Sequence, residues 1–166
     1  HKNLTTDKNV NLNNDTGEDT KIRGYIDAPD STNINLHSST DGTHFGRAVN
    51  RSGDNFICYA WRGIAGLSAF GSHSGALSSV TGTTVGSNGY CGFAPRFVII
   101  KRKNASGNWA IFDALRGGSL YLEGESSAVE QGPNTISVVF TSNGFYAGTH
   151  AGVGASGGEY ISIAFA

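Results

Sequence analysis

The chain has 166 residues, enough for one domain with a sizeable core, and a formal net charge of −1. Near-neutral charge excludes the basic footprint expected for binding to nucleic acid or an anionic membrane, and no apolar run reaches membrane-spanning length. With 24 glycines and only 3 prolines, the composition predicts an all-β fold with many turns. Without a signal peptide or initiator methionine, the sequence indicates a processed chain or a piece of a longer protein.

Residues 1–20 are predicted to form an extended polar arm, because they are mostly Asn, Asp, Thr and other polar residues. Such an arm cannot bury much surface of its own, so it is either flexible or lent as a strand to a neighbouring chain. Residues 21–62 are predicted to add short strands, at 21–26, 33–37 and 55–61. We expect residues 21–62 to form one compact unit with residues 63–166.

The segment Asn55–Trp61 is the strongest strand prediction in the first half of the chain. Its alternate residues are apolar on both sides, which is typical of a strand buried on both faces. Residues 49–61 also align with residues 153–165, each with a Ser-Gly turn followed by an apolar and aromatic run. This internal repeat predicts that both segments are strands preceded by a turn. Chance recurrence of Ser-Gly turns in a glycine-rich chain is the alternative.

The second half of the chain is organised around two apolar runs, Phe97–Ile100 and Trp109–Phe112. A polar segment with Asn104 and Gly107 separates them, so the pattern predicts a β-hairpin with a longer loop. Phe97–Ile100 is apolar without alternation, which places it at the centre of a sheet. Further strands are predicted at 66–74, 80–85, 119–122, 135–141 and 159–166, with a loop over 123–134 and a turn at 142–144. The predicted fold is an antiparallel β-sandwich or jelly-roll-like module with Gly-rich loops.

Three stretches carry a family resemblance. The first lies within residues 91–116, where Gly-Phe-Ala-Pro-Arg-Phe-Val-Ile-Ile-Lys is followed by Gly-Asn-Trp-Ala-Ile-Phe-Asp-Ala-Leu-Arg. The second is the segment 56–75. The third is Ser142–Phe145 followed by residues 155–166. In this order they resemble a repeated β domain from tail fibres and virion structural proteins of marine and cyanobacterial phages. The resemblance covers roughly the last two-thirds of the chain and brings no catalytic motif with it. Because such segments end one module and lead into the next in that family, the resemblance implies that residues 21–62 close a preceding module and that residues 63–166 form the family-like β module.

The side chains that often carry chemistry form no recognised motif. The histidines are scattered among turns without metal-ligand spacing, and no nucleophile motif or cofactor fingerprint is present, so we expect no enzyme activity, cofactor or metal. Cys58 and Cys91 are interpreted as buried free thiols. Asp113 and Arg116 are expected to form a local ion pair or turn cap; a carboxylate pair of Asp113 with Glu123 or Glu125 is a weaker alternative. The basic run Lys101–Lys103 is expected to be solvated at a hairpin tip.

A glycan site needs an aromatic face for the sugar ring and planar polar groups for its hydroxyls. Six residues in loop-like segments meet this description: Tyr90, Asn104, Asn143, Phe145, Tyr146 and His150. The Gly-rich stretch Gly148–Gly158 would let the loop adapt to a ligand. Simple packing over that loop is an equally good reading of Tyr146, and Trp109 is assigned to the core.

The resemblance implies a structural and adhesive module of a phage tail fibre, binding a host surface glycan or lipopolysaccharide. It implies a virion location, assembly in the host cytoplasm, other virion proteins as partners, and a homo-oligomer, commonly a trimer. Three alternatives stay open: a purely structural decoration or connector protein without a host ligand, a filament subunit that polymerises through its N-terminal strand, and a polysaccharide depolymerase.

Overall fold

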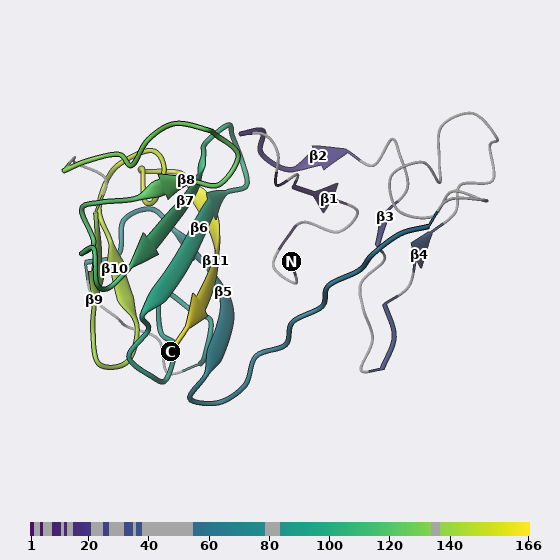
Figure 1. Ribbon diagram of the computed structural model, residues 1–166, viewed down its shortest axis with the longest axis horizontal. Helices are drawn as coiled ribbons and strands as arrows, with labels where there is room; N and C mark the ends of the chain where they lie inside the picture. Colours follow the sequence, from purple (N-terminus) through teal and green to yellow (C-terminus); the bar gives the residue numbers. More distant parts are fainter. Residues whose placement is uncertain are drawn as a thin grey trace.

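The main sheet is built around strand β6 (Phe97–Arg102), whose apolar run predicted a central position. Five antiparallel strands lie in the order β5-β11-β6-β7-β8 (Figure 1). β6 is the third of the five, and Val98 and Ile100 on one of its faces have no exposed surface. The predicted central strand is therefore confirmed.

The computed structural model describes residues 1, 4, 8–10, 12, 15–20, 25–26, 32–34, 36–37, 55–78, 84–133 and 137–166. The regular secondary structure of these residues consists entirely of β-strands, and all paired strands in the sheets are antiparallel. The predicted all-β, sandwich-like antiparallel fold is confirmed. No helix in the described part of the chain could cross a membrane.

The neighbours of β6 are two strands that the sequence also predicted. These are β11 (Glu159–Phe165) and β7 (Trp109–Asp113), and Ile99 of β6 pairs with Ile111 of β7. The outer strands are β5 (Ser68–Ser74) and β8 (Leu122–Glu123). β8 is shorter than the predicted 119–122 strand because Tyr121 instead bridges to Gln131.

A second layer covers one face of this sheet. The hairpin of β9 (Val138–Phe140) and β10 (Phe145–Ala147) turns at 142–144 as predicted. Its buried side chains join those of the sheet in one core: Ala69, Leu77, Cys91, Val98, Ile100, Ala110, Phe112, Tyr121, Val138, Phe145, Ala147, Val153, Tyr160 and Ala164. The start of the predicted 135–141 strand and most of the predicted 80–85 strand lie outside the described residues; Thr84 and Val85 are in no strand.

His73 gives this core a titratable group. It is buried, stacks on Tyr160 at a ring-centroid distance of 5.0 Å, and donates from Nε2 to the Val153 carbonyl at 2.7 Å. Its Nδ1 is buried without a hydrogen-bond partner. Burial lowers the pKa of His73 below its ordinary 6.5, although the Val153 hydrogen bond raises it. The ring is therefore held in its neutral form.

We expect acid to destabilise the protein through His73. Because the folded-state pKa lies below 6.5, the unfolded chain binds the proton more readily, and stability falls as pH drops below 6.5, by up to about 1.4 kcal/mol per pH unit. The test compares melting temperatures of wild type and His73→Gln between about pH 7.5 and 5. A Gln amide can still donate a hydrogen bond but does not titrate, so its slope should be shallower. Identical slopes would contradict this role of His73.

Among its described residues, the N-terminal third has four two-residue strands in two small sheets. They are β1 (Lys8–Asn9) with β2 (Asp19–Thr20), and β3 (Tyr25–Ile26) with β4 (Leu36–His37). β3 and β4 fall at the ends of the predicted 21–26 and 33–37 strands. The other residues of those predicted strands are only partly among the described residues.

The described part of the arm docks on the module of its own chain. The Glu18 amide donates to the Lys103 carbonyl at 2.6 Å, and the Gly107 amide donates to the Asp15 carbonyl at 2.8 Å. His1 Nε2 lies 3.1 Å from the carbonyl oxygen of Ser162 in β11. We expected the arm to be flexible or to contact a neighbouring chain or module; within this chain, its described residues contact the sheet and the loop between β6 and β7.

The predicted strand at 55–61 is wrong for this structure. Residues 55–63 lie in no strand, and no backbone hydrogen bond joins residues 55–61 to another described residue. All seven side chains are exposed, although a strand buried on both faces was predicted. In Figure 1 the segment runs as an extended trace outside the sheet before it enters β5.

Candidate functional site

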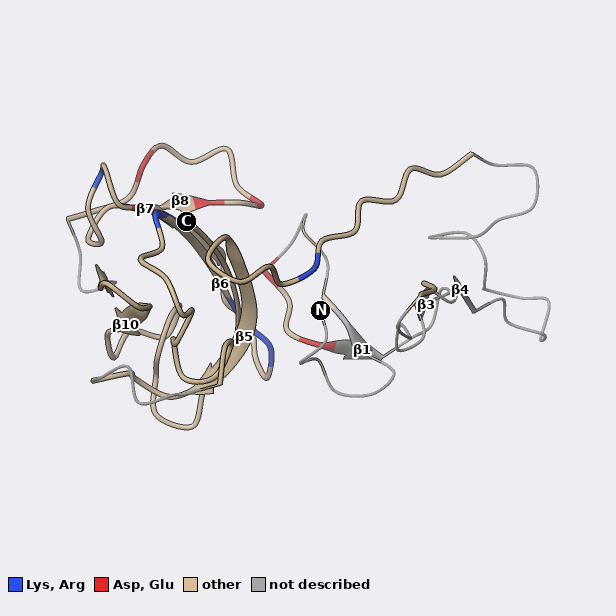
Figure 2. Cartoon of the chain, turned by 90° about the horizontal axis from the view of Figure 1, so that it is seen from below, with Lys and Arg blue, Asp and Glu red and all other residues tan. Residues whose placement is uncertain are grey.

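The exposed segment Asn55–Trp61 is the most unusual surface of the described chain. Ile57 is 83% and Trp61 66% exposed, and the rings of Tyr59 and Trp61 stack at a centroid distance of 6.0 Å. The segment carries no charged residue, so it appears in the colour of uncharged residues in Figure 2. Large apolar side chains gathered on one exposed stretch mark an interaction surface or an aggregation liability.

The same residue pattern is buried elsewhere in the chain. β11 reads Glu-Tyr-Ile-Ser-Ile-Ala-Phe where the exposed segment reads Asn-Phe-Ile-Cys-Tyr-Ala-Trp. Ile161, the counterpart of the 83%-exposed Ile57, is only 2% exposed. The repeat is present as a sequence pattern, but the prediction that both segments form strands is wrong, because only residues 159–165 form one. Residues 49–54 lie outside the described residues.

Two strands at the edges of the module, β5 and β10, are each capped at one residue by the module's own chain. On the outer side of β5, the Ser72 amide donates to Gly86 at 2.9 Å and its carbonyl accepts from Asn88 at 3.2 Å. The Leu77 amide caps β10 through Ala147 at 2.8 Å. Such capping prevents sheets from pairing edge to edge. The capped strands therefore offer the exposed segment little free backbone.

The face of the sheet that points away from the core is also apolar. Phe165 of β11 lies between Phe70 and Phe97, with ring centroids 6.3 and 6.4 Å away. Other half-buried residues of this outer face are Ile99, Ile111, Leu122 and Ile163. The arm reaches one side of it, where the rings of His1 and Phe70 are 6.2 Å apart. The sheet therefore carries apolar side chains on both faces.

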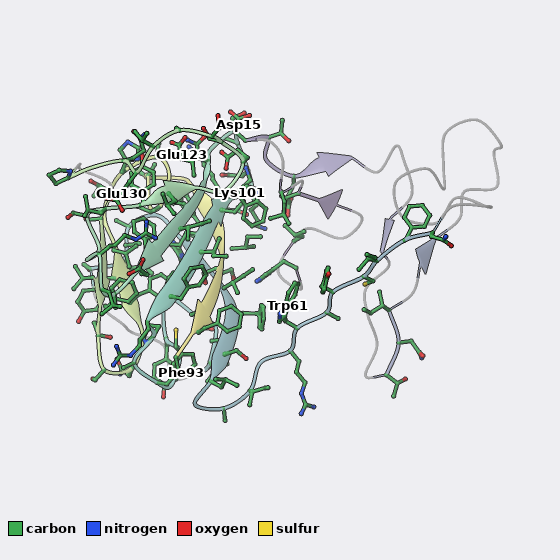
Figure 3. All side chains as sticks on the ribbon, in the orientation of Figure 1. Asp15, Trp61, Phe93, Lys101, Glu123 and Glu130 are labelled. Atoms are coloured by element: carbon green, nitrogen blue, oxygen red, sulfur yellow. The ribbon has the colours of Figure 1, made fainter. Side chains whose placement is uncertain are left out.

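A buried lysine fixes the arm at one end of the outer face. Lys101 has no exposed surface, and its Nζ donates to the carbonyls of Asp15 at 2.8 Å and Gly107 at 2.6 Å. Figure 3 shows Asp15 and Lys101 at the same end of the sheet. Burial lowers the pKa of Lys101, while the charges of Glu125 and Asp15 raise it. The prediction of a solvated Lys101 is therefore wrong.

The other residues around Lys101 tie this end of the sheet together. Lys103 forms ion pairs with Glu159 at 3.0 Å and with Glu18 at 3.7 Å. One oxygen of Glu125 accepts from the Trp109 amide at 2.9 Å, and the other is buried without a hydrogen-bond partner. Trp109 is buried, as its assignment to the core predicted. This cluster holds structure rather than presenting a reactive group, because its amine and one carboxylate oxygen are already bound.

Four of the six predicted ligand residues come together at one corner of the module. Tyr90 bridges to Gly144, and the Cys91 amide donates to the Asn143 carbonyl at 2.9 Å. Asn143 is exposed and Tyr146 half-buried, so both present surface to solvent. Phe145, by contrast, is 1% exposed and packs in the core, so its ring offers no face to a ligand.

The remaining two predicted residues fold back on the chain. Asn104 donates to the Gly157 carbonyl at 2.8 Å and accepts from the Glu159 amide at 3.1 Å. His150 Nδ1 accepts from the Gly152 amide at 3.1 Å. Their side chains are therefore engaged in fixing the Gly-rich loop.

No catalytic grouping appears among the described residues, which include no cluster of three metal-ligating side chains. Asp113 pairs with Arg116 as predicted, and its carboxylate also accepts from the Leu115 and Arg116 amides. These hydrogen bonds and the Arg116 charge lower the pKa of Asp113. Glu123 is bound instead by Asn108. The proposed carboxylate partners thus serve different structural contacts.

The two cysteines are free thiols in different environments. Cys91 is buried, and burial raises its pKa to about 12, which makes the thiol unreactive. Cys58 lies on the exposed segment, so the prediction that it is buried is wrong.

Comparison with known proteins identifies a family but no characterised relative. The chain matches, over residues 1–166, the model of a family described as "Domain of unknown function (DUF7483)". No curated protein and no solved structure matches it. Function is therefore inferred from the residues and contacts of the chain itself.

Proposed function

We propose that this chain, which belongs to the DUF7483 family, is a structural module of a virion, of the kind found in phage tail fibres. The motif order within residues 91–116 supports this proposal, because it resembles repeated domains of such proteins. The capped strands of this β module and the ion pairs and hydrogen bonds that already engage its charged side chains suit a structural, non-enzymatic role. Its place is the virion, and it is assembled in the host cytoplasm.

The observation that carries the proposal is the exposed apolar segment Asn55–Trp61. Burying one large apolar side chain contributes about 1.5–3 kcal/mol, so exposed Ile57, Tyr59 and Trp61 strongly favour association with another polypeptide surface. In a virion that surface is another subunit or module. A homo-oligomer, including the trimer common among fibres, is one form of this assembly.

The association is tested by making the segment polar while keeping its tendency to be extended. We expect wild type to form concentration-dependent oligomers in analytical ultracentrifugation, and Ile57→Thr, Tyr59→Thr and Trp61→Thr together to abolish them. The melting temperature of the module should stay nearly unchanged, since these side chains contact none of the core.

The matched control removes exposed apolar side chains elsewhere. Leu115 is 91% and Val129 82% exposed on loops of the module, and Leu115→Thr with Val129→Thr should leave the oligomer intact. If the segment variant and the loop variant sediment alike, the assembly role is contradicted.

A second candidate function is adhesion to a host glycan or lipopolysaccharide. It is favoured by one observation: the backbone bridge between Tyr90 and Gly144 brings half-buried Tyr90 to the chain segment that carries exposed Asn143 and half-buried Tyr146. The Asn143 Oδ1 accepts from the Thr141 hydroxyl at 3.2 Å, which leaves its NH2 group for a ligand. An aromatic side chain with a planar polar neighbour is the combination that sugar binding requires. Binding of the isolated oligomer to a glycan array separates this role from a purely structural one, and release of reducing ends from host capsule would identify a depolymerase.

Tyr146→Ala should weaken adsorption to host cells if this corner binds the receptor. The ring lies on β10, beside Val139 of β9, which is 53% exposed; its loss should cost roughly tenfold in binding, the equivalent of about 1.4 kcal/mol. Adsorption is measured at equal thermal stability, with Val139→Ala as the neighbouring control. Equal adsorption of Tyr146→Ala and wild type would remove the corner from consideration.

A further inference from the structure

The chain holds two segments of one sequence pattern, and only one of them, β11, lies in the described sheet. β11 lies between β5 and β6, where Ser162 is paired with both Gly71 and Ile100. The exposed segment repeats the β11 pattern position by position, with an aromatic residue at each end of the apolar run and Ala60 in the place of Ala164. In this module the position is filled, so the exposed segment has no place in it.

We infer that Asn55–Trp61 is a closing strand that completes the sheet of a second module of the same kind, by entering between its β5-type and β6-type strands. The inference rests on the assembly role proposed above and names its partner. That partner is a module whose own closing position is open. It supplies two parallel rows of backbone N–H and C=O groups and an apolar surface on each face.

The side-chain alternation of the segment fits this position. Core-facing Tyr160, Ser162 and Ala164 of β11 have as counterparts Phe56, Cys58 and Ala60, which keep an aromatic ring followed by two small residues. Ser162 pairs with Gly71, where an added Cβ would meet the Gly86 backbone, so the chain is closely packed beside these small residues. The opposite row of the segment, Ile57, Tyr59 and Trp61, corresponds to the apolar outer face of β11.

The pairing also explains why the segment forms no backbone hydrogen bond with the described part of its own module. Each strand in the middle of a sheet needs partners on both sides, whereas the edge of β5 is capped by Gly86 and Asn88. The segment could therefore not be added as a sixth strand without displacing those residues. An open closing position in another module satisfies both of its sides.

The first experiment asks whether the segment is a β11-type strand, using the full chain. Residues 159–165 are replaced by the sequence of residues 55–61. We expect a cooperative unfolding transition with a melting temperature lowered by roughly 10 °C, mainly because the Tyr160 hydroxyl is lost. Hydrogen exchange should show the grafted strand protected. The control graft exchanges the first six of these seven residues in three neighbouring pairs and keeps the last one in place, which puts the wrong side chains on each face.

The control graft should not fold cooperatively. If both grafts fold alike, or if neither folds, the segment has no specific fit to the closing position and the inference is overturned.

The second experiment tests donation between chains. Ser162→Pro opens the closing position of an acceptor chain, because proline cannot serve a central strand. Full-length wild type, as donor, should form a one-to-one complex with it and restore its cooperative unfolding. A Tyr59→Pro donor should bind roughly a hundredfold more weakly. If the wild-type and Tyr59→Pro donors bind the acceptor with equal affinity, the proposed strand donation is wrong. The assembly role would still stand, because the Thr variants test it separately.

Discussion

Replacement of Lys101 by alanine should lower the free energy of unfolding by about 3–5 kcal/mol and release the arm from the sheet. Lys101 is fully buried and its Nζ is the donor for two backbone carbonyls, those of Asp15 and Gly107. Without it, these carbonyls lose their partner. The Glu125 carboxylate, which already has one buried oxygen without a hydrogen bond, loses the nearby positive charge that offsets its burial.

Two further variants separate the charge from the packing. Lys101→Met keeps the apolar stem against Trp109 but removes the ammonium, so it should recover part of the stability lost in Lys101→Ala. Lys103→Ala removes a neighbouring cation whose Glu159 partner is half exposed, and it should cost no more than about 1 kcal/mol. Denaturant titration gives the stabilities, and hydrogen exchange at Gly107 and Glu18 reports on the arm. A Lys101→Ala variant as stable as Lys103→Ala would contradict the buried anchor.

The strands of the main sheet could be predicted because the polarity of their side chains matches the burial of each position. Phe97–Ile100 is apolar at every position because β6 lies between two strands and both sheet faces are covered or half covered. The polar residues between β6 and β7 likewise mark the connection of that hairpin. In these places the local pattern and the tertiary environment agree, which is what makes such patterns informative.

The exposed segment could not be predicted from its pattern alone. Asn55–Trp61 and Glu159–Phe165 have the same alternation, yet only the second has partner strands within the module. A pattern indicates which faces of a strand are to be buried, but not which polypeptide buries them. The repeat itself was the signal that could have shown this, because one sheet has one central closing position.

The predicted glycan site was only partly assembled for a similar reason. Tyr90, Asn143 and Tyr146 share a corner because the chain around residue 90 pairs with that around Gly144, a contact between distant parts of the sequence. Asn104 and His150 were chosen as polar loop residues, but their side chains bind nearby backbone. Composition identifies polar loop residues without showing whether their hydrogen bonds are already used.

The Gly-rich loop 148–158 illustrates the same limit. We expected it to adapt to a ligand, but a buried tyrosine ties it to the sheet. The Tyr160 hydroxyl donates to the Ala151 carbonyl at 2.8 Å and accepts from the Ala155 amide at 2.9 Å. Val153 between them has no exposed surface. The glycines let the chain turn closely around this ring, since a Cβ at Gly158 would meet the ring and hydroxyl of Tyr160.

Tyr160→Ala should therefore be among the most damaging single changes in the module, with a loss of about 3–5 kcal/mol for the buried ring. Tyr160→Phe keeps the ring and its stacking on His73 but leaves one loop amide and one loop carbonyl without a partner, which should cost about 1–3 kcal/mol. The difference between the two variants separates core packing from loop attachment.

Hydrogen exchange gives the decisive measurement, because it distinguishes loop release from general destabilisation. In Tyr160→Phe the Ala155 amide should exchange much faster than in wild type. The exchange rates of the β6 amides should change only as much as the global free energy of unfolding changes. Tyr146→Phe is the matched control: Tyr146 is half-buried on β10, and losing its hydroxyl should change stability by no more than about 0.5 kcal/mol. If the Ala155 amide exchanges at the same rate in both Phe variants, the Tyr160 hydroxyl does not hold the loop, and the glycines alone must determine its course.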